Sequence, residues 1–146
     1  MAERKADPVR PADDAARALA RELLGGAVHG ALGVLDPATG APQVSRIALA
    51  RDADGTPLTL ISELSAHTAA LRADPRASLM VGEPGEKGDP LTHPRLMLQC
   101  RAAFADRADP GHPALRERFL AQYPKAKLYI DFADFSLVRL EVEDAF

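Results

Sequence analysis

Cysteine is almost absent from this sequence, because Cys100 is the only one, and a single cysteine cannot form an internal disulfide. Tryptophan is missing and aromatic residues make up only 5% of the chain, so aliphatic side chains and alanine must build most of the core. No apolar run approaches the roughly 20 residues that a membrane-spanning helix needs. Residues Met1–Arg10 also lack the apolar stretch of a secretory signal peptide. We therefore expect a cytoplasmic protein with no membrane partner.

Charge of one sign is not concentrated anywhere in the chain. Charged residues make up 27% of the sequence, the net charge is −3, and acidic and basic side chains are interspersed. Proteins that bind nucleic acid or an anionic membrane carry a basic patch or stripe. The sequence therefore predicts no nucleic-acid partner.

Several familiar site motifs are missing as well. His29, His93 and His112 are scattered, and with one cysteine there is no Cys/His cluster at metal-ligand spacing. Neither a Gly-x-Gly-x-x-Gly pattern nor a phosphate-binding P-loop occurs, and the serines lack a Gly-x-Ser-x-Gly elbow. We predict no metal site, no Rossmann-type or Walker-type nucleotide site and no hydrolase triad.

The length of 146 residues is enough for one domain with a sizeable core. Residues 1–10 are polar and are expected to form a flexible tail, which leaves residues 11–146 as a single domain. Amphipathic spacing and helix-stop residues predict three helices, the first of which should end at Gly25-Gly26. Their expected ranges are Asp13–Leu24, Ser65–Ala73 and Ala114–Tyr123.

Short apolar or alternating segments separated by turn residues predict antiparallel strands rather than a doubly wound fold. The first three should form a meander through the turns at Asp36–Gly40 and Asp52–Gly55. The expected strands are Val28–Leu35, Val44–Ala50, a strand ending at Ser62, one beginning at Ala77, Arg95–Phe104 and Phe135–Val142.

The densest group of hydroxyl and imidazole side chains lies where a strand ends and the second helix begins. Free backbone N–H groups and the helix dipole favour an anion at a helix start. The same pattern also fits an ordinary N-cap, in which the Ser65 hydroxyl accepts the Thr68 N–H. Both interpretations stay open on this stretch alone. The candidate donors are Ser62, Ser65, His67 and Thr68.

Four segments occur in an order that resembles a known superfamily: Leu60–Thr68, Asp74–Leu79, Gly88–Arg95 and Tyr123–Ala126. They are similar to the FMN-binding split-barrel superfamily that includes pyridoxamine 5′-phosphate oxidase, and most similar to its haem-utilisation branch. The likeness runs from about Leu24 to Glu143. It implies an α+β fold, namely an antiparallel Greek-key split β-barrel of about six strands with flanking helices.

The resemblance also implies that FMN is the cofactor. Arg46 is the leading candidate: it matches the arginine that grips the FMN phosphate, where a guanidinium can make a two-pronged contact. The alternative is a surface arginine on an edge strand. The main chain of the next three residues would run beside the flavin ring. These residues are Ile47, Ala48 and Leu49.

Ile61 and Ser62 match a pair at a strand end, with Ser62 donating to the phosphate. His67 and Thr68 stand where pyridoxamine 5′-phosphate oxidase has two consecutive basic residues, so phosphate neutralisation should be weaker here. The remaining matches are Arg95 and Gln99 on one strand face and Lys127 of a partner subunit, each of which could equally be a plain surface residue.

We therefore expect an FMN-dependent oxidoreductase acting on a small molecule, with a homodimer implied by the resemblance alone and no catalytic residue assigned. The flavin would carry the redox chemistry. One alternative is a haem-binding or haem-degrading protein, which is disfavoured because relatives in that branch typically continue past the last strand. A second is a flavin-binding module without turnover. Oxidation of pyridoxamine 5′-phosphate itself is not expected, because the C-terminal Arg and His motif has no counterpart after Glu141.

Overall fold

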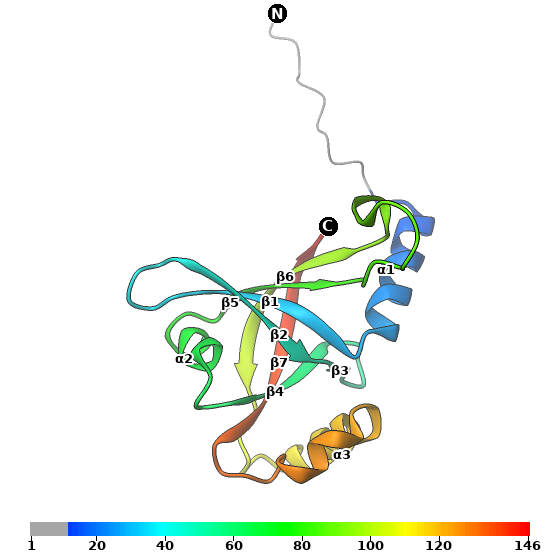
Figure 1. Cartoon of the computed structure of the whole chain (residues 1–146). Coiled ribbons are helices and arrows are strands. Elements are labelled where there is room, and N and C mark those ends of the chain that lie inside the picture. Colours follow the sequence, from blue (N-terminus) through cyan, green and yellow to red (C-terminus); the bar gives the residue numbers. More distant parts are fainter. Residues whose placement is uncertain (1–11) are drawn as a thin grey trace, which may run out of the picture.

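A computed structural model describes residues 12–146, so the predicted tail at residues 1–10 lies outside the described part. Within that part, seven antiparallel strands form one sheet in the order β2-β1-β5-β6-β7-β4-β3, with three α-helices around it (Figure 1). None of these helices is long and apolar enough to cross a membrane. The strands are β1 (His29–Leu35), β2 (Pro42–Ala48), β3 (Ala50–Arg51), β4 (Pro57–Ser62), β5 (Arg76–Val81), β6 (Leu96–Phe104) and β7 (Phe135–Ala145).

The two ends of the sheet are joined by a single residue. β2 and β3 are the outermost strands, and only Leu49 separates them in the sequence. The chain pairs with β1 before Leu49 and with β4 after it, which curls the sheet into a barrel. Counted as one bent strand, β2 and β3 reduce the total to six. The predicted α+β split barrel is therefore confirmed.

The strand pairing differs from a simple meander. The hairpin β1-β2 forms as expected, but β4 pairs with β3 and β7 and not with β2. The reason is the bend at Leu49, whose buried side chain holds the chain against the core while it changes partner. The predicted meander was therefore only partly right.

The helices lie on three sides of the barrel (Figure 1). α1 runs through both glycines that were expected to stop it, because the Arg51 guanidinium donates to the carbonyls of Leu24 and Ala27 at its end. α3 starts two residues before the expected Ala114, with proline in its first turn, a position that suits it. The helices are α1 (Asp14–Gly26), α2 (Ala66–Ala73) and α3 (His112–Gln122), with 3₁₀ turns η1 (Pro90–Thr92) and η2 (Pro124–Leu128).

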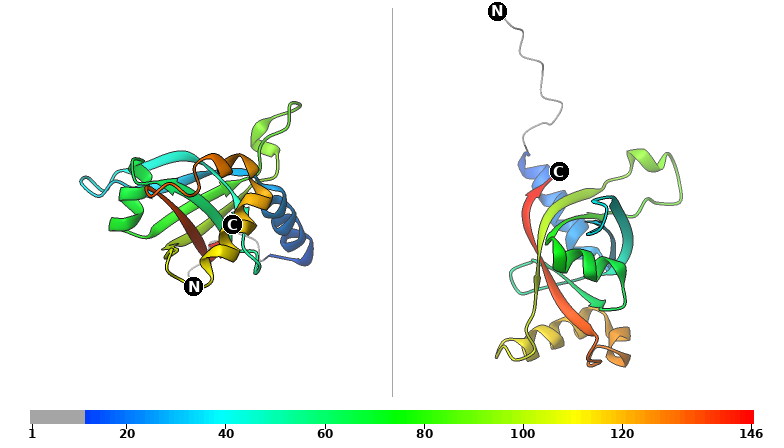
Figure 2. Two further views of the ribbon diagram at one scale, coloured as in Figure 1. Left: turned by 90° about the horizontal axis from the view of Figure 1, so that it is seen from below. Right: turned by 90° about the vertical axis from the view of Figure 1, so that its left-hand side faces the viewer.

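Two apolar cores leave one outer surface of the sheet uncovered. The first fills the barrel, with α2 residues Ala70 and Leu71 packed inside it. The second lies outside β3, β4 and β7, where α3 and η2 place Phe119 and Ala126 against the sheet. No described helix forms a comparable core over the outer side of β2, β1, β5 and β6, and we call this surface the open face. The loop between β5 and β6 projects away from the barrel in both views of Figure 2.

Candidate functional site

The open face contains a row of apolar side chains that begins at an arginine. Cross-strand pairing places Arg46 of β2 opposite Ala31 of β1, Ala31 opposite Met80 of β5, and Met80 opposite Met97 of β6. Residues directly opposite in a sheet share one side. Met80 is 45% exposed and Met97 38% exposed, although both lie in the middle of a sheet. Phe146 extends the row, because its backbone exchanges both hydrogen bonds with Met97. A contiguous exposed apolar strip of this kind marks a binding surface.

A second row of residues, next to the first on the open face, lines a cavity. Gly33, Ser78 and Gln99 lie side by side on β1, β5 and β6. With their neighbours they line a cavity of about 500 Å³. The arginines at its rim, Arg76 and Arg101, are already paired with Asp74 and Glu143. The cavity therefore adds concave apolar space to the open face without an unpaired cation.

Among the described residues, Arg46, on β2, has no such carboxylate partner. Its side chain is exposed on β2, and within residues 12–146 it makes no ion pair and no hydrogen bond. An exposed guanidinium without a carboxylate neighbour can bind an anionic group of a ligand in a two-pronged way. Arg46 is therefore available for the role that the sequence predicted for it.

At the start of α2, in contrast, two hydroxyl groups already donate to acceptors within the chain. Thr68 is fully buried and its hydroxyl donates to the Ser62 carbonyl at 2.6 Å. The Ser62 hydroxyl donates to the Asp134 carboxylate at 3.3 Å and accepts the Leu64 N–H at 3.1 Å. Ser65 caps the helix through its backbone carbonyl and not through its hydroxyl, as the N-cap interpretation had it. The hydroxyls of Ser62 and Thr68 are thus engaged within the chain, and Asp134 adds a negative charge beside them.

His67 is held in a way that favours its neutral form. Its ring lies 3.1 Å from the Ser45 hydroxyl, which joins β2 to the start of α2, and desolvation by burial lowers the pKa of His67. A phosphate dianion would instead be stabilised by the charged imidazolium. Since Ser45 and Arg46 are neighbours in a strand, their side chains point to opposite sides of the sheet. The structure thus brings the predicted residues Arg46 and His67 to one edge strand but to different faces of it.

We expect the burial of His67 to make stability depend on pH. Because its pKa is lower in the folded state, the unfolded chain binds more protons just below the ordinary value of about 6.5. The free energy of unfolding should therefore fall as the pH drops below that value. His67→Gln should flatten this part of the curve, as measured by urea unfolding between pH 5 and pH 8. An unchanged pH slope in the variant would show that His67 is not held neutral.

Two of the backbone groups that were expected beside a flavin ring already form hydrogen bonds within the chain. Ile47, Leu49 and Ile61 are buried in the barrel core, so their side chains cannot reach a ligand. The Leu49 N–H donates to the Val28 carbonyl, and the Ala48 carbonyl accepts from the hydroxyl of Thr59. These backbone groups stabilise the bend at Leu49, which leaves fewer of them for a cofactor.

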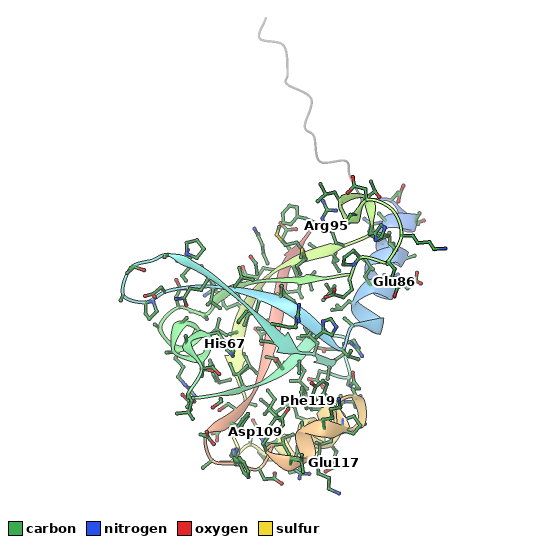
Figure 3. The ribbon with its side chains drawn as sticks, viewed as in Figure 1. His67, Glu86, Arg95, Asp109, Glu117 and Phe119 are labelled. Atoms are coloured by element: carbon green, nitrogen blue, oxygen red, sulfur yellow. The ribbon has the colours of Figure 1, made fainter. Side chains whose placement is uncertain are left out.

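The other predicted contacts are spread over the molecule. Gln99 lies on the open face, but Arg95 lies near the projecting loop, where it donates to the Leu91 carbonyl. Figure 3 shows Arg95 at one end of the molecule and His67 well apart from it beside α2. Lys127 is exposed on η2 next to α3, away from the open face. One chain therefore does not bring Lys127 together with Arg46, and Arg95 lies two positions from Met97, at the far end of the row that begins at Arg46.

The sequence did not single out three residues that matter here. Met80 and Met97 alternate with buried neighbours on their strands, so the alternation itself could have placed them on an outer face. Asp134 lies 72 positions from Ser62 along the chain, and only the pairing of β4 with β7 brings the two together. No local pattern predicts that contact.

Comparisons with known proteins agree with this architecture. HOZ, a chloroplastic non-canonical heme oxygenase from Arabidopsis thaliana, is 35% identical over 122 residues, which are 83% of this chain and 36% of that protein. A heme-binding protein from Mycobacterium smegmatis is 31% identical with a TM-score of 0.80, over 94% of this chain and 54% of that one. A protein of unknown function from Agrobacterium tumefaciens is 35% identical with a TM-score of 0.84, over 95% of this chain and 59% of that one.

The chain spans little more than a third of the length of the Arabidopsis protein and somewhat over half of the two structures. The likeness is therefore to one part of each relative. The family model of pyridoxamine 5′-phosphate oxidase, however, matches residues 17–146, which is most of this sequence. The chain belongs to the pyridoxamine 5′-phosphate oxidase family.

Proposed function

We propose that this chain is a haem-binding member of the family and that haem lies on the open face. The observation that supports this most is the contrast between two surfaces. The open face offers exposed apolar side chains and one unpaired arginine, Arg46. At the start of α2 the hydroxyls of Ser62 and Thr68 are engaged, and a carboxylate, Asp134, lies beside them. A ligand that is mostly apolar with an anionic edge fits the first surface better than a phosphate fits the second.

The dimensions of the row suit a flat tetrapyrrole. From Arg46 to Met97 it crosses four strands, and three interstrand spacings amount to about 14 Å. Ala31, Met80 and Met97 would contact the flat apolar ring, while Arg46 would bind a propionate at its edge. Haem supplies its own redox and oxygen chemistry when it is bound. This chain would supply the surface, the orientation and the charge that hold it.

A second copy of the chain is the proposed cover for the bound ring. Small-molecule sites usually bury most of the ligand surface, whereas a single open face would leave one side of the ring in water. Two open faces related by a two-fold axis would enclose it and would also bury Met80 and Met97. We therefore propose a homodimer with the ligand at the interface.

The second candidate is the FMN-dependent oxidoreductase expected from the sequence. The availability of Arg46 favours it, because this position matches the arginine that grips the FMN phosphate. Neutral His67 and the carboxylate of Asp134 weigh against tight phosphate binding. In this candidate Arg46 and Gln99 would hold the flavin, and the flavin would carry the electrons.

Parallel titrations with hemin and with FMN test the proposal. We expect hemin to bind the dimer with a shifted Soret band and FMN to bind weakly. Arg46→Ala should weaken hemin binding about tenfold or more, since a charge-assisted contact contributes about 1.5–3 kcal/mol. Arg17→Ala on α1 is the control, because that arginine is also exposed but already lies beside a carboxylate, Asp14. Tight FMN binding without hemin binding would establish the second candidate instead.

A further inference from the structure

We infer that His29 is the side chain that ligates the iron of the bound haem, an inference that rests on the proposed haem site. His29 is the first residue of β1 and lies opposite Ala48 of β2. The alternation along β1 puts His29 on the same side as Ala31, whereas Gly30 and Leu32 are buried on the other. His29 is therefore on the open face, two positions from the apolar row that begins at Arg46.

The surroundings of the His29 ring resemble those of a metal ligand. Its Nδ1 atom is buried and, within residues 12–146, has no hydrogen-bond partner. The nearest carboxylate oxygen, Oε1 of Glu83, lies 3.5 Å from Nδ1. The side chain is nevertheless 41% exposed, so atoms of His29 other than Nδ1 are in contact with solvent. The ring thus directs Nδ1 to a carboxylate, and in the proposed site the other nitrogen, Nε2, serves the open face.

This arrangement is the one that metal-binding histidines use. The ligating nitrogen is unprotonated, while the second nitrogen donates its proton to a carboxylate, which fixes the tautomer and strengthens the ligand. Here Nε2 would bind the iron and Nδ1–H would donate to Glu83. The distance of 3.5 Å is longer than a good hydrogen bond, so a small shift of the Glu83 side chain would complete the contact.

The other histidines are unsuited to this role. The ring of His67 contacts Ser45 behind the edge strand, and both ring nitrogens of His93 are engaged by backbone groups of its own loop. His112 begins α3, outside the open face. Burial raises the pKa of the Cys100 thiol to about 11, so it does not supply a thiolate at neutral pH. Met80 and Met97 are the competing ligands on the open face.

The ligand can be identified by spectroscopy on the full chain loaded with hemin. We expect absorbance spectra of the ferric and ferrous forms that are typical of histidine ligation. The electron paramagnetic resonance spectrum of the ferric form should show the same ligation. His29→Ala should lose this signature and regain it when free imidazole is added, and His29→Gln should lose it in the same way. Glu83→Gln should keep the histidine signature but lower haem affinity about 10- to 100-fold and raise the reduction potential, as expected of a positioning residue. His112→Ala is the matched control and should change nothing.

The outcomes separate this inference from the proposed function. If the unaltered chain binds no hemin, both fail. If hemin binds and the His29 variants keep the histidine signature, the inference is overturned while the haem site stands. A spectrum that changes with Met80→Leu or Met97→Leu but not with His29→Ala would overturn it in favour of a thioether ligand.

Discussion

Met80→Asp is expected to separate the proposed dimer into monomers and to remove hemin binding while leaving the fold intact. Met80 lies at the centre of the apolar row and is 45% exposed in one chain, so a carboxylate there is tolerated by the monomer. In the dimer the same carboxylate would be buried without a partner, and the two-fold axis would place it in both copies. We expect the dimer dissociation constant to rise by about 100-fold or more. Light scattering after size exclusion measures this directly.

Leu64→Asp is the matched control for this experiment. Leu64 is an apolar residue with 89% exposure, and it lies before α2 rather than on the open face. This change should leave both the molecular mass and hemin binding as they were. If Met80→Asp also left them unchanged, the open face would not be the surface where two copies meet.

Gly82→Ala is expected to destabilise the protein by about 2–4 kcal/mol, which is large for the addition of one methyl group. Gly82 has a φ of +104°, a region that L-residues other than glycine rarely adopt. A Cβ atom at this position would also lie 2.6 Å from the Pro94 carbonyl oxygen and 2.8 Å from the Arg95 Cα. Both are backbone atoms of the residues directly before β6, where the projecting loop ends. Neither atom can therefore move aside without shifting β6. Chemical unfolding measures the loss.

Gly25→Ala provides a control of the opposite sign. Gly25 lies near the end of α1, and a Cβ there would meet nothing within 4 Å. Because alanine is the better helix former, we expect a stabilisation of about 0.5–1 kcal/mol. Equal effects of the two substitutions would mean that the conformation of Gly82 has no special role.

The fold was largely predictable because local patterns agree with it. Alternation put Arg95 and Gln99 on one strand face, and the structure has Gln99 exposed between the buried Leu98 and Cys100. The glycines at the end of the first helix misled the prediction, because Arg51, which lies more than 20 positions further along, binds the carbonyls there. The closure of the barrel was not predictable from local signals either, since it depends on the bend at Leu49.

The candidate site was less predictable than the fold. The sequence correctly indicated that polar donors gather where α2 begins, but it could not show that Thr68 is buried or that Asp134 accepts from Ser62. Both facts depend on contacts between distant strands. In the same way, Glu83 reaches His29 only because β5 pairs with β1. These contacts are the reason why the structure favours haem over FMN as the proposed ligand.

Hydrogen exchange of the chain with and without hemin tests the central claim most directly. The account predicts that hemin protects backbone amides in the four strands of the open face and leaves those of α2 and α3 as they were. Protection concentrated at the start of α2, around Ser62 and His67, would contradict it, because the ligand would then occupy the surface where the hydroxyls of Ser62 and Thr68 are already engaged.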